Sequence, residues 1–273
     1  MSLRSALWRV GLTLTVVGAL FAFQKPFHQF PGVEYRHFEV PPGSDEKTEF
    51  AFARMMFPGG WNDGYRGRFD GDWRQGLTLW TQDYPRADRH FSQALRRLSR
   101  VHTRSVEQPI MLEEGDQYNW PWLYAVQVGE WGITPEQARL LRDYCLRGGF
   151  FMADDLHGTE EWEVFYKSMQ MVFPDRQIVD VPDSDPIFHV LYDLDDKMQV
   201  PGQAHLSLGY KNDGKGAHWR AIYDDKGRIM IAISQNSDIG DAWEYADDAW
   251  YPEKFSGFAI RLGVNYVVYA MTH

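Results

Sequence analysis

The chain has 273 residues, a formal net charge of -10, an aromatic content of 15% with 11 tryptophans, and a single cysteine, Cys145. Beyond the N-terminal segment no cluster of lysine and arginine occurs, which argues against nucleic acid as the main partner. One cysteine excludes an intramolecular disulfide and a cysteine metal cluster. The abundant aromatic side chains fill a core or line a site for a flat or sugar-like ligand.

Residues 1–24 predict a signal peptide or an uncleaved signal anchor. Arg4 and Arg9 are the only charges before Lys25, and the stretch from Val10 to Phe23 is apolar apart from two threonines and two glycines. A basic stretch followed by an apolar one is typical of a secretory signal, and basic residues stay on the cytoplasmic side. We therefore expect an exported or membrane-anchored protein whose domain is extracytoplasmic, in the cell envelope. The alternative is a buried core helix.

Residues 25–48 are rich in proline and glycine, have no apolar period, and predict a linker or an extended arm. The domain is expected to span residues 49–273. Apolar alternation predicts a first strand over 50–55, and a helix over 88–100 would be capped by Asp88. In the glycine-rich loop between them, Trp61, Tyr65 and Trp73 are candidates for a stacking floor, with core packing as the alternative.

The clearest unit begins at Thr134. Thr134, Pro135 and Gln137 supply an N-cap, a first-turn proline and a capping-box partner for a helix that ends at Gly148. A buried strand over 150–153, a loop over 154–158, a helix over 160–171 capped by Thr159, and a strand over 178–181 follow. This order predicts βαβ units and a mainly parallel sheet.

The last third of the chain predicts a hairpin and a helix. Strands over 219–223 and 228–233 flank a turn at 224–227. A final helix is expected over 255–271, with an apolar side.

The loop after the central predicted strand is the first candidate site. Ligands of open α/β sheets bind beyond the carboxyl ends of strands, where this chain has Asp154, Asp155 and His157. Two carboxylates and an imidazole could ligate a metal or act as acid and base. Strand alternation predicts that Asp154 and Asp155 point to opposite sides. The structural alternative for either carboxylate is a turn or helix cap.

Three further segments carry candidate polar side chains. His189 follows a proline-fixed turn, Asn236 and Asp238 follow the last predicted strand, and Arg86 could bind a carboxylate or phosphate. Each has a structural alternative: a loop-holding hydrogen bond, an Asx-turn with a helix cap, or an ion pair. Cys145 lies on the apolar face of a predicted helix, where a nucleophile is not expected.

Known catalytic signatures are absent from the sequence: it contains no G-x-S-x-G, H-E-x-x-H, G-x-x-x-x-G-K-[ST] or G-x-G-x-x-G. No residue pattern identifies a cofactor or a definite metal ligand set.

Motifs spread over most of the chain after residue 48 resemble the domain-of-unknown-function 4159 family. They are Phe-Ala-Arg-Met at 52–55, Trp-x-x-Asp-Tyr-Pro-x-Ala-Asp at 80–88, Trp-Pro-Trp-Leu-Tyr at 120–124, Arg-Gly-Gly-Phe-Phe-Met-Ala-Asp-Asp at 147–155, Asp-Pro-Ile-Phe-His at 185–189, Asn-Ser-Asp-Ile-Gly at 236–240 and Asn-Tyr-Val-Val-Tyr-Ala-Met-Thr-His at 265–273. The resemblance implies an α/β fold similar to class I glutamine amidotransferases, a flavodoxin-like three-layer sandwich. It implies no established activity.

That superfold usually carries a nucleophilic cysteine where this chain has Asp154 and Asp155, so amidotransferase chemistry is not expected. Relatives without the cysteine include trehalose-utilisation-like domains, for which sugar-related roles are suspected.

Three functions remain open from the sequence. The leading hypothesis is a binding domain for a small polar or carbohydrate-like ligand, held by Asp154, Asp155, His157, His189, Asn236 and Asp238. The second is a metal-assisted hydrolase of a carbohydrate or envelope polymer that uses Asp155 and His157. The third is a structural partner in a cell-envelope complex.

Overall fold

A computed structural model describes residues 24–60 and 72–273. The expected export segment, except for Gln24, lies outside the described residues, as do Trp61 and Tyr65. Within the described residues, no helix has both the length and the apolar character needed to cross a membrane.

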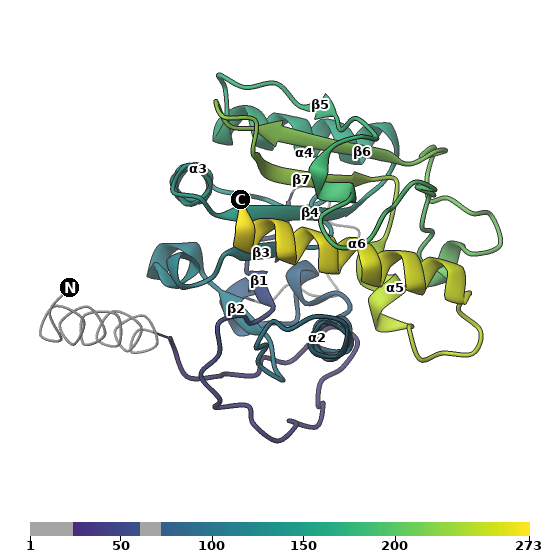
Figure 1. Cartoon of the computed structure of the whole chain (residues 1–273). Helices are drawn as coiled ribbons and strands as arrows, with labels where there is room; N and C mark the ends of the chain where they lie inside the picture. The colour runs from purple at the N-terminus through teal and green to yellow at the C-terminus, as the bar shows by residue number, and fades with distance from the viewer. Residues whose placement is uncertain (1–23, 61–71) are drawn as a thin grey trace, which may run out of the picture.

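The centre of the molecule is a seven-stranded sheet in the order β2-β1-β3-β4-β7-β6-β5 (Figure 1). Its strands are β1 (Ala53–Met55), β2 (Gln108–Ile110), β3 (Trp122–Ala125), β4 (Phe150–Leu156), β5 (Val179–Asp180), β6 (His218–Tyr223) and β7 (Ile229–Gln235). The first five in that spatial order run parallel, while β6 is antiparallel to β7 and to β5. The expected mainly parallel sheet and the β6–β7 hairpin are confirmed.

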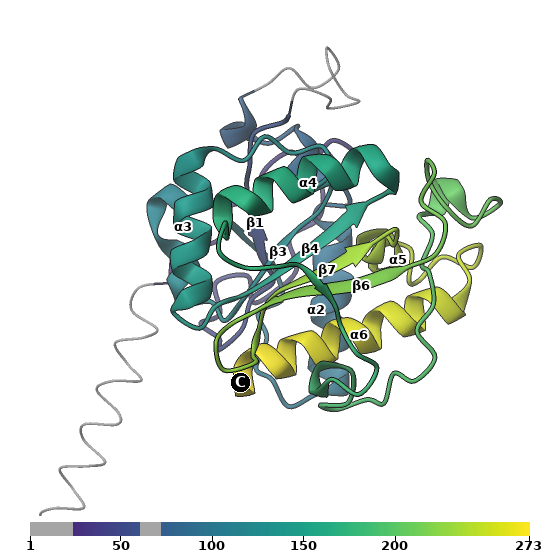
Figure 2. The same cartoon turned by 90° about the horizontal axis from the view of Figure 1, so that it is seen from above.

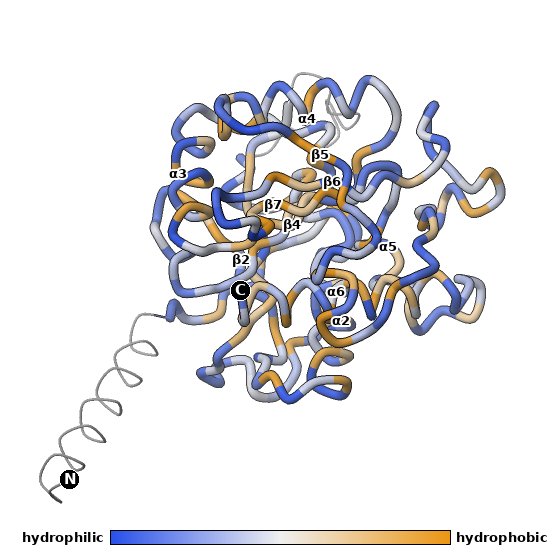
Figure 3. Tube along the Cα trace, turned by 45° about the horizontal axis from the view of Figure 1, so that its top comes forward, coloured by the Kyte–Doolittle hydropathy of each residue, from blue (hydrophilic) through white to orange (hydrophobic). Residues whose placement is uncertain are grey.

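Helices cover both faces of the sheet, giving the expected three-layer, flavodoxin-like α/β fold (Figures 1 and 2). The helices α2 (Arg86–Leu98), α5 (Ile239–Glu244) and α6 (Glu253–Thr272) pack on one face, and α3 (Pro135–Leu146) and α4 (Gly158–Val172) pack on the other. Strands covered on both faces need apolar side chains on both sides. Phe150 accordingly packs in one core layer and Phe151 in the other, and hydrophobic residues follow the central strands in Figure 3.

The helix α3 begins as its sequence predicts. The Thr134 hydroxyl oxygen accepts a hydrogen bond from the Gln137 amide, and the Gln137 side chain accepts one from the Thr134 amide. Gly148, which follows the helix, has a φ of 104°, a conformation that favours glycine.

The strand β4 is longer than expected, and the prediction of a loop over 154–158 is wrong for its first three residues. The carbonyl of Leu156 still accepts a hydrogen bond from the Asn236 amide, and Leu156 pairs with Gln235 of β7. A register shift separates Ala153 from Leu156, and Asp155 between them has a φ of 51°. The sheet thus continues past the acidic pair by means of a local bulge.

Two predicted helix caps are wrong because other partners bind those side chains. Asp88 lies inside α2, fully buried in an ion pair with Arg54 of β1. Thr159 lies inside α4 and donates its hydroxyl to Asp213, while His157 occupies the cap position. In both places a long-range contact replaced the local bond that the sequence suggested.

The segment before the domain lies along it as an extended arm. The amides of Phe30 and Val33 donate to the side-chain oxygens of Tyr84 and Thr81. Further along the arm, the Glu34 carboxylate accepts hydrogen bonds from the Gln82 side chain and the Asp83 amide. The arm therefore places Glu34 beside Gln82 and Asp83, in the segment just before α2.

Candidate functional site

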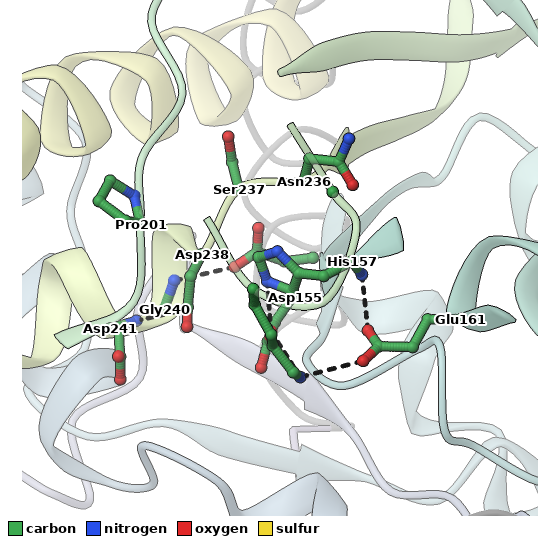
Figure 4. Close-up of polar contacts among 12 residues, drawn as sticks. Asp155, His157, Glu161, Pro201, Asn236, Ser237, Asp238, Gly240 and Asp241 are labelled. Carbon is green, nitrogen blue, oxygen red and sulfur yellow. Dashed lines mark hydrogen bonds and ion pairs between the residues drawn. The ribbon is translucent and has the colours of Figure 1, made fainter. Parts of the chain in front are cut away.

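Three side chains meet where β4 and β7 end. Asp155 and His157 come from the end of β4, and Asp238 follows β7. A ring nitrogen of His157, Nε2, lies 2.8 Å from Asp155 Oδ1, and the three residues can offer ligand atoms that all lie within 4.8 Å of one another. They lie together near the centre of Figure 4.

Asn236 fixes the backbone around this group. Its side-chain oxygen accepts a hydrogen bond from the Gly158 amide at the start of α4, and its amide nitrogen donates to the Gly216 carbonyl. Its own φ of 65° is a left-handed conformation that asparagine tolerates better than most residues. Asn236 thus acts here as a positioning residue.

Asp154 and Asp155 have different hydrogen-bond partners. Asp154 Oδ2 accepts hydrogen bonds from the Tyr124 hydroxyl and from the amides of Ile239 and Gly240 at the start of α5. Burial and the nearby Asp155 charge raise the pKa of Asp154 to about 7, against the effect of these donors.

A lysine compensates the charge of Asp155. Lys211 Nζ lies 3.8 Å from Asp155 Oδ1 and 3.2 Å from Glu161 Oε1. Burial opposes ionisation of Asp155, but Lys211 and the His157 hydrogen bond outweigh it and lower the pKa of Asp155 to about 2. Asp155 is therefore a charged carboxylate that orients His157.

An open groove of about 710 Å³ adjoins this group. Its walls are formed by the start of α4, the segment before α3 and the loop that carries Lys211: Gly129, Glu130, His157, Thr159, Glu160, Glu161, Val164, Lys211, Asn212 and Asp213. His157 Nδ1 is buried and has no hydrogen-bond partner among the described residues. The Asp155–His157 pair can therefore serve as a base, as a metal ligand, or as a hydrogen-bonding group for a ligand.

A second acidic group adjoins the first through Asp238. We call Glu34, Asp83, Asp238, Asp241 and Glu244 the five-carboxylate cluster. Ligand atoms lie within 4.8 Å of one another in two of its subsets, one of Asp83 with Asp238 and Asp241, the other of Glu34 with Asp83 and Glu244.

Burial, followed by mutual repulsion, raises the pKa of most of the cluster. The pKa of Asp83 and that of Asp238 lie well above the ordinary value, and that of Glu244 is about 8. For Asp241 burial outweighs the hydrogen bond from the Gln203 amide, and its pKa is about 6.

Two of the predicted site residues lie elsewhere. The ring nitrogens of His189 lie 2.9 Å from Asp193 Oδ1 and 2.8 Å from the Asp183 carbonyl oxygen, so His189 holds its own loop. Arg86 forms an ion pair with Asp247 at 2.7 Å and a hydrogen bond with the Tyr35 hydroxyl. The structural alternative accounts for both.

The other aromatic and thiol candidates serve packing. Trp73, the described member of the expected stacking floor, packs against the core layer on the α3–α4 face. Cys145 is fully buried on α3, and burial raises the pKa of its thiol to about 12. Burial and the raised pKa both disfavour a thiolate nucleophile at Cys145.

Sequence reasoning missed Lys211, Glu161, Glu34 and Asp83 as site residues. Lys211 lies in a loop with no secondary-structure signal, and Glu161 is one of several acids on α4. Asp83 lies in the segment 80–88, in which the sequence pattern indicated only Arg86 as a ligand-binding residue.

The chain belongs to the family described as "Domain of unknown function (DUF4159)", whose model matches residues 74–271. No curated protein matches the chain.

Proposed function

For this member of the family we propose that the domain binds a small polar ligand of the neutral, hydroxyl-rich kind that carbohydrates represent, in the groove beside α4. One observation carries the proposal: His157, oriented by Asp155, is among the residues that line an open groove, and its buried Nδ1 has no hydrogen-bond partner among the described residues. A buried polar atom without a partner costs free energy, which a ligand hydroxyl would recover.

The charges of the groove favour a neutral ligand over an anion. Glu130, Glu160, Glu161 and Asp213 line it, against the single cation Lys211. The first amides at the start of α4 are also occupied: His157 donates to Glu161, Gly158 to Asn236 and Thr159 to Asp213. A phosphate would therefore lack the free amides that helix N-termini usually offer it.

We also propose that the fold is that of class I glutamine amidotransferases without their chemistry. The support is the flavodoxin-like layering, with Asp154 and Asp155 near the end of β4 where a cysteine nucleophile would be expected. The only cysteine of the chain, Cys145, is buried on α3.

The basic and apolar pattern of residues 1–24 supports an extracytoplasmic location, anchored in or exported across a membrane. Cell fractionation with an antibody against the C-terminus tests this location. Full-length protein in the membrane fraction supports an anchor, and protein confined to the cytoplasmic fraction refutes the proposal.

A hydrolase is the second candidate, and the Asp155–His157 hydrogen bond favours it. An imidazole held by a carboxylate can remove a proton from water. In an alternative arrangement, Asp155, His157 and Asp238 would together hold a divalent cation that activates the water. Release of reducing ends from oligosaccharides and envelope polymers tests this candidate. It requires activity in the natural chain that His157→Gln abolishes.

The binding proposal is tested by calorimetry with neutral sugars and the matching sugar phosphates. We expect neutral sugars to bind more tightly than their phosphates. Glu160→Gln should weaken binding about fivefold, because an acceptor charge at the groove wall is lost. Glu163→Gln is the matched control, since Glu163 is exposed on the same helix but does not line the groove. If no sugar binds, or if both variants behave alike, the proposal is wrong.

A further inference from the structure

We propose that the five-carboxylate cluster binds a hard divalent cation of the Ca²⁺, Mg²⁺ or Mn²⁺ class, and that this cation fastens the N-terminal arm to the domain. This site is distinct from the groove and goes beyond the proposed function. Only Asp238 connects the two, since it also lies beside Asp155 and His157.

Within each of two triplets of the cluster, the spacing of the oxygens is compatible with one cation. Two oxygens bound to the same Ca²⁺ at about 2.4 Å lie at most about 4.8 Å apart. Ligand atoms of Asp83, Asp238 and Asp241 meet this limit, and so do those of Glu34, Asp83 and Glu244. Because Asp83 belongs to both sets, it is the centre of the proposed site.

One carboxylate of the cluster has a buried oxygen without a partner. Asp83 is 1% exposed, and its Oδ2 has no hydrogen-bond partner among the described residues. A side chain at Gly240 would collide with this oxygen, so the Asp83 carboxylate lies directly against the start of α5. A buried carboxylate oxygen without a donor is the atom that a cation would satisfy.

Among the described residues, no basic side chain forms an ion pair with the cluster. In the described part of the chain, none of its five carboxylates forms an ion pair with lysine, arginine or histidine. The nearest arginines have other partners, Asp88 for Arg54 and Asp247 for Arg86. Burying several acids together without a counter-charge is costly unless they hold protons or a metal ion.

Glycine lets two carboxylates approach the backbone closely at the edge of the cluster. A Cβ at Gly202 would lie 2.6 Å from Asp238 Oδ2 and 2.9 Å from Asp241 Oδ2. Asp241 is the partly exposed member of its triplet, so solvent reaches one side of the cluster. All the side-chain ligands are carboxylates, which suit a hard cation and not one that prefers nitrogen or sulfur.

The arm would be held by such a cation through Glu34. Glu34 Oε2 already accepts a hydrogen bond of 2.8 Å from the Asp83 amide, so the two carboxylates approach each other from separate segments. A cation between them would convert repulsion into attraction. Hydrogen exchange of the arm amides around Glu34 should then slow when the cation binds.

The test titrates chelator-treated protein with Ca²⁺, Mg²⁺ and Mn²⁺ by calorimetry and thermal unfolding. At about a hundredfold excess over Kd, we expect one of them to raise Tm by about 5 °C or more and to slow exchange in residues 29–39. Tb³⁺ should bind as a Ca²⁺ substitute. It should emit on tryptophan excitation, because Trp243 is adjacent in sequence to the proposed ligand Glu244 on the same helix.

Asp83→Asn and Asp241→Asn should each weaken binding at least about tenfold, since each removes a charged ligand. Asp225→Asn, at a carboxylate whose side chain is 89% exposed, is the control for the loss of one negative charge. If Asp83→Asn does not fold, the partly exposed Asp241 and Tb³⁺ competition in the natural chain still test the site. Absence of binding by all these ions, or equal binding by all variants, overturns the proposal and leaves the groove proposal unaffected.

Discussion

Raising the pH should destabilise the cation-free protein, although most acidic proteins lose stability in acid. The pKa values of Asp154, Asp241 and Glu244 are raised to about 7, 6 and 8, chiefly by burial. Each carboxyl binds its proton more tightly in the folded chain than in the unfolded chain. Their contribution to stability is therefore complete below the ordinary carboxyl pKa near 4 and is lost as pH rises through the folded values.

The slope of the unfolding free energy against pH follows from the number of protons that the folded chain binds and the unfolded chain does not. A carboxyl that is protonated when folded and ionised when unfolded removes about 1.4 kcal/mol of unfolding free energy per pH unit. With three such groups between pH 5 and 6, the upper limit is about 4 kcal/mol per unit. We expect a loss of at least about 1.4 kcal/mol per unit between pH 5 and 7.

Urea unfolding at several pH values, with chelator present, measures this slope. Asp154→Asn keeps an oxygen for the Tyr124, Ile239 and Gly240 donors but cannot titrate, so the slope between pH 5 and 6 should fall by about 1.4 kcal/mol per unit. Asp225→Asn should leave it unchanged. Stability that is flat or rises from pH 5 to 7 would refute the assignment of buried protonated carboxyls.

Three further outcomes follow from the same structure. Arg54→Met leaves the Asp88 carboxylate buried without its partner and should cost about 3–5 kcal/mol in urea unfolding, whereas a loss below about 1 kcal/mol contradicts the burial of the pair. Gly240→Ala places a Cβ against Asp83 Oδ2 and should lower Tm and abolish cation binding together; unchanged binding would show that the cation lies elsewhere. Cys145 should resist iodoacetamide in the native protein and react after unfolding, because it is buried and its pKa is about 12; modification at the rate of a free thiol would contradict this.

Local signals predicted the parts of the fold that depend on local contacts. The capping box at Thr134 and Gln137 sets the start of α3, and these residues contact each other across one helical turn. The apolar run at 150–153 predicted β4, and the rule for parallel sheets indicated a candidate site at its end. The acidic pair, His157 and Asp238 were found in this way.

Long-range contacts determine the side-chain partners that local sequence patterns could not predict. Asp88 was predicted to be a helix cap, but its carboxylate instead binds Arg54, which lies 34 residues earlier in the chain. Lys211 sets the charge of Asp155 from a loop with no pattern of its own. His189 looked like a site residue because its partners, Asp183 and Asp193, cannot be recognised as such without the turn that brings them close.

The central claim, that His157 presents a free ring nitrogen to a ligand in the groove, is tested most directly by histidine-selective ¹⁵N NMR during titration with neutral sugars. We predict that the ring signals of His157 shift on saturation while those of His189 stay in place, because His189 is engaged with its own loop. Unchanged His157 signals at saturating concentrations of the sugars, or equal shifts of both histidines, would contradict the proposed site.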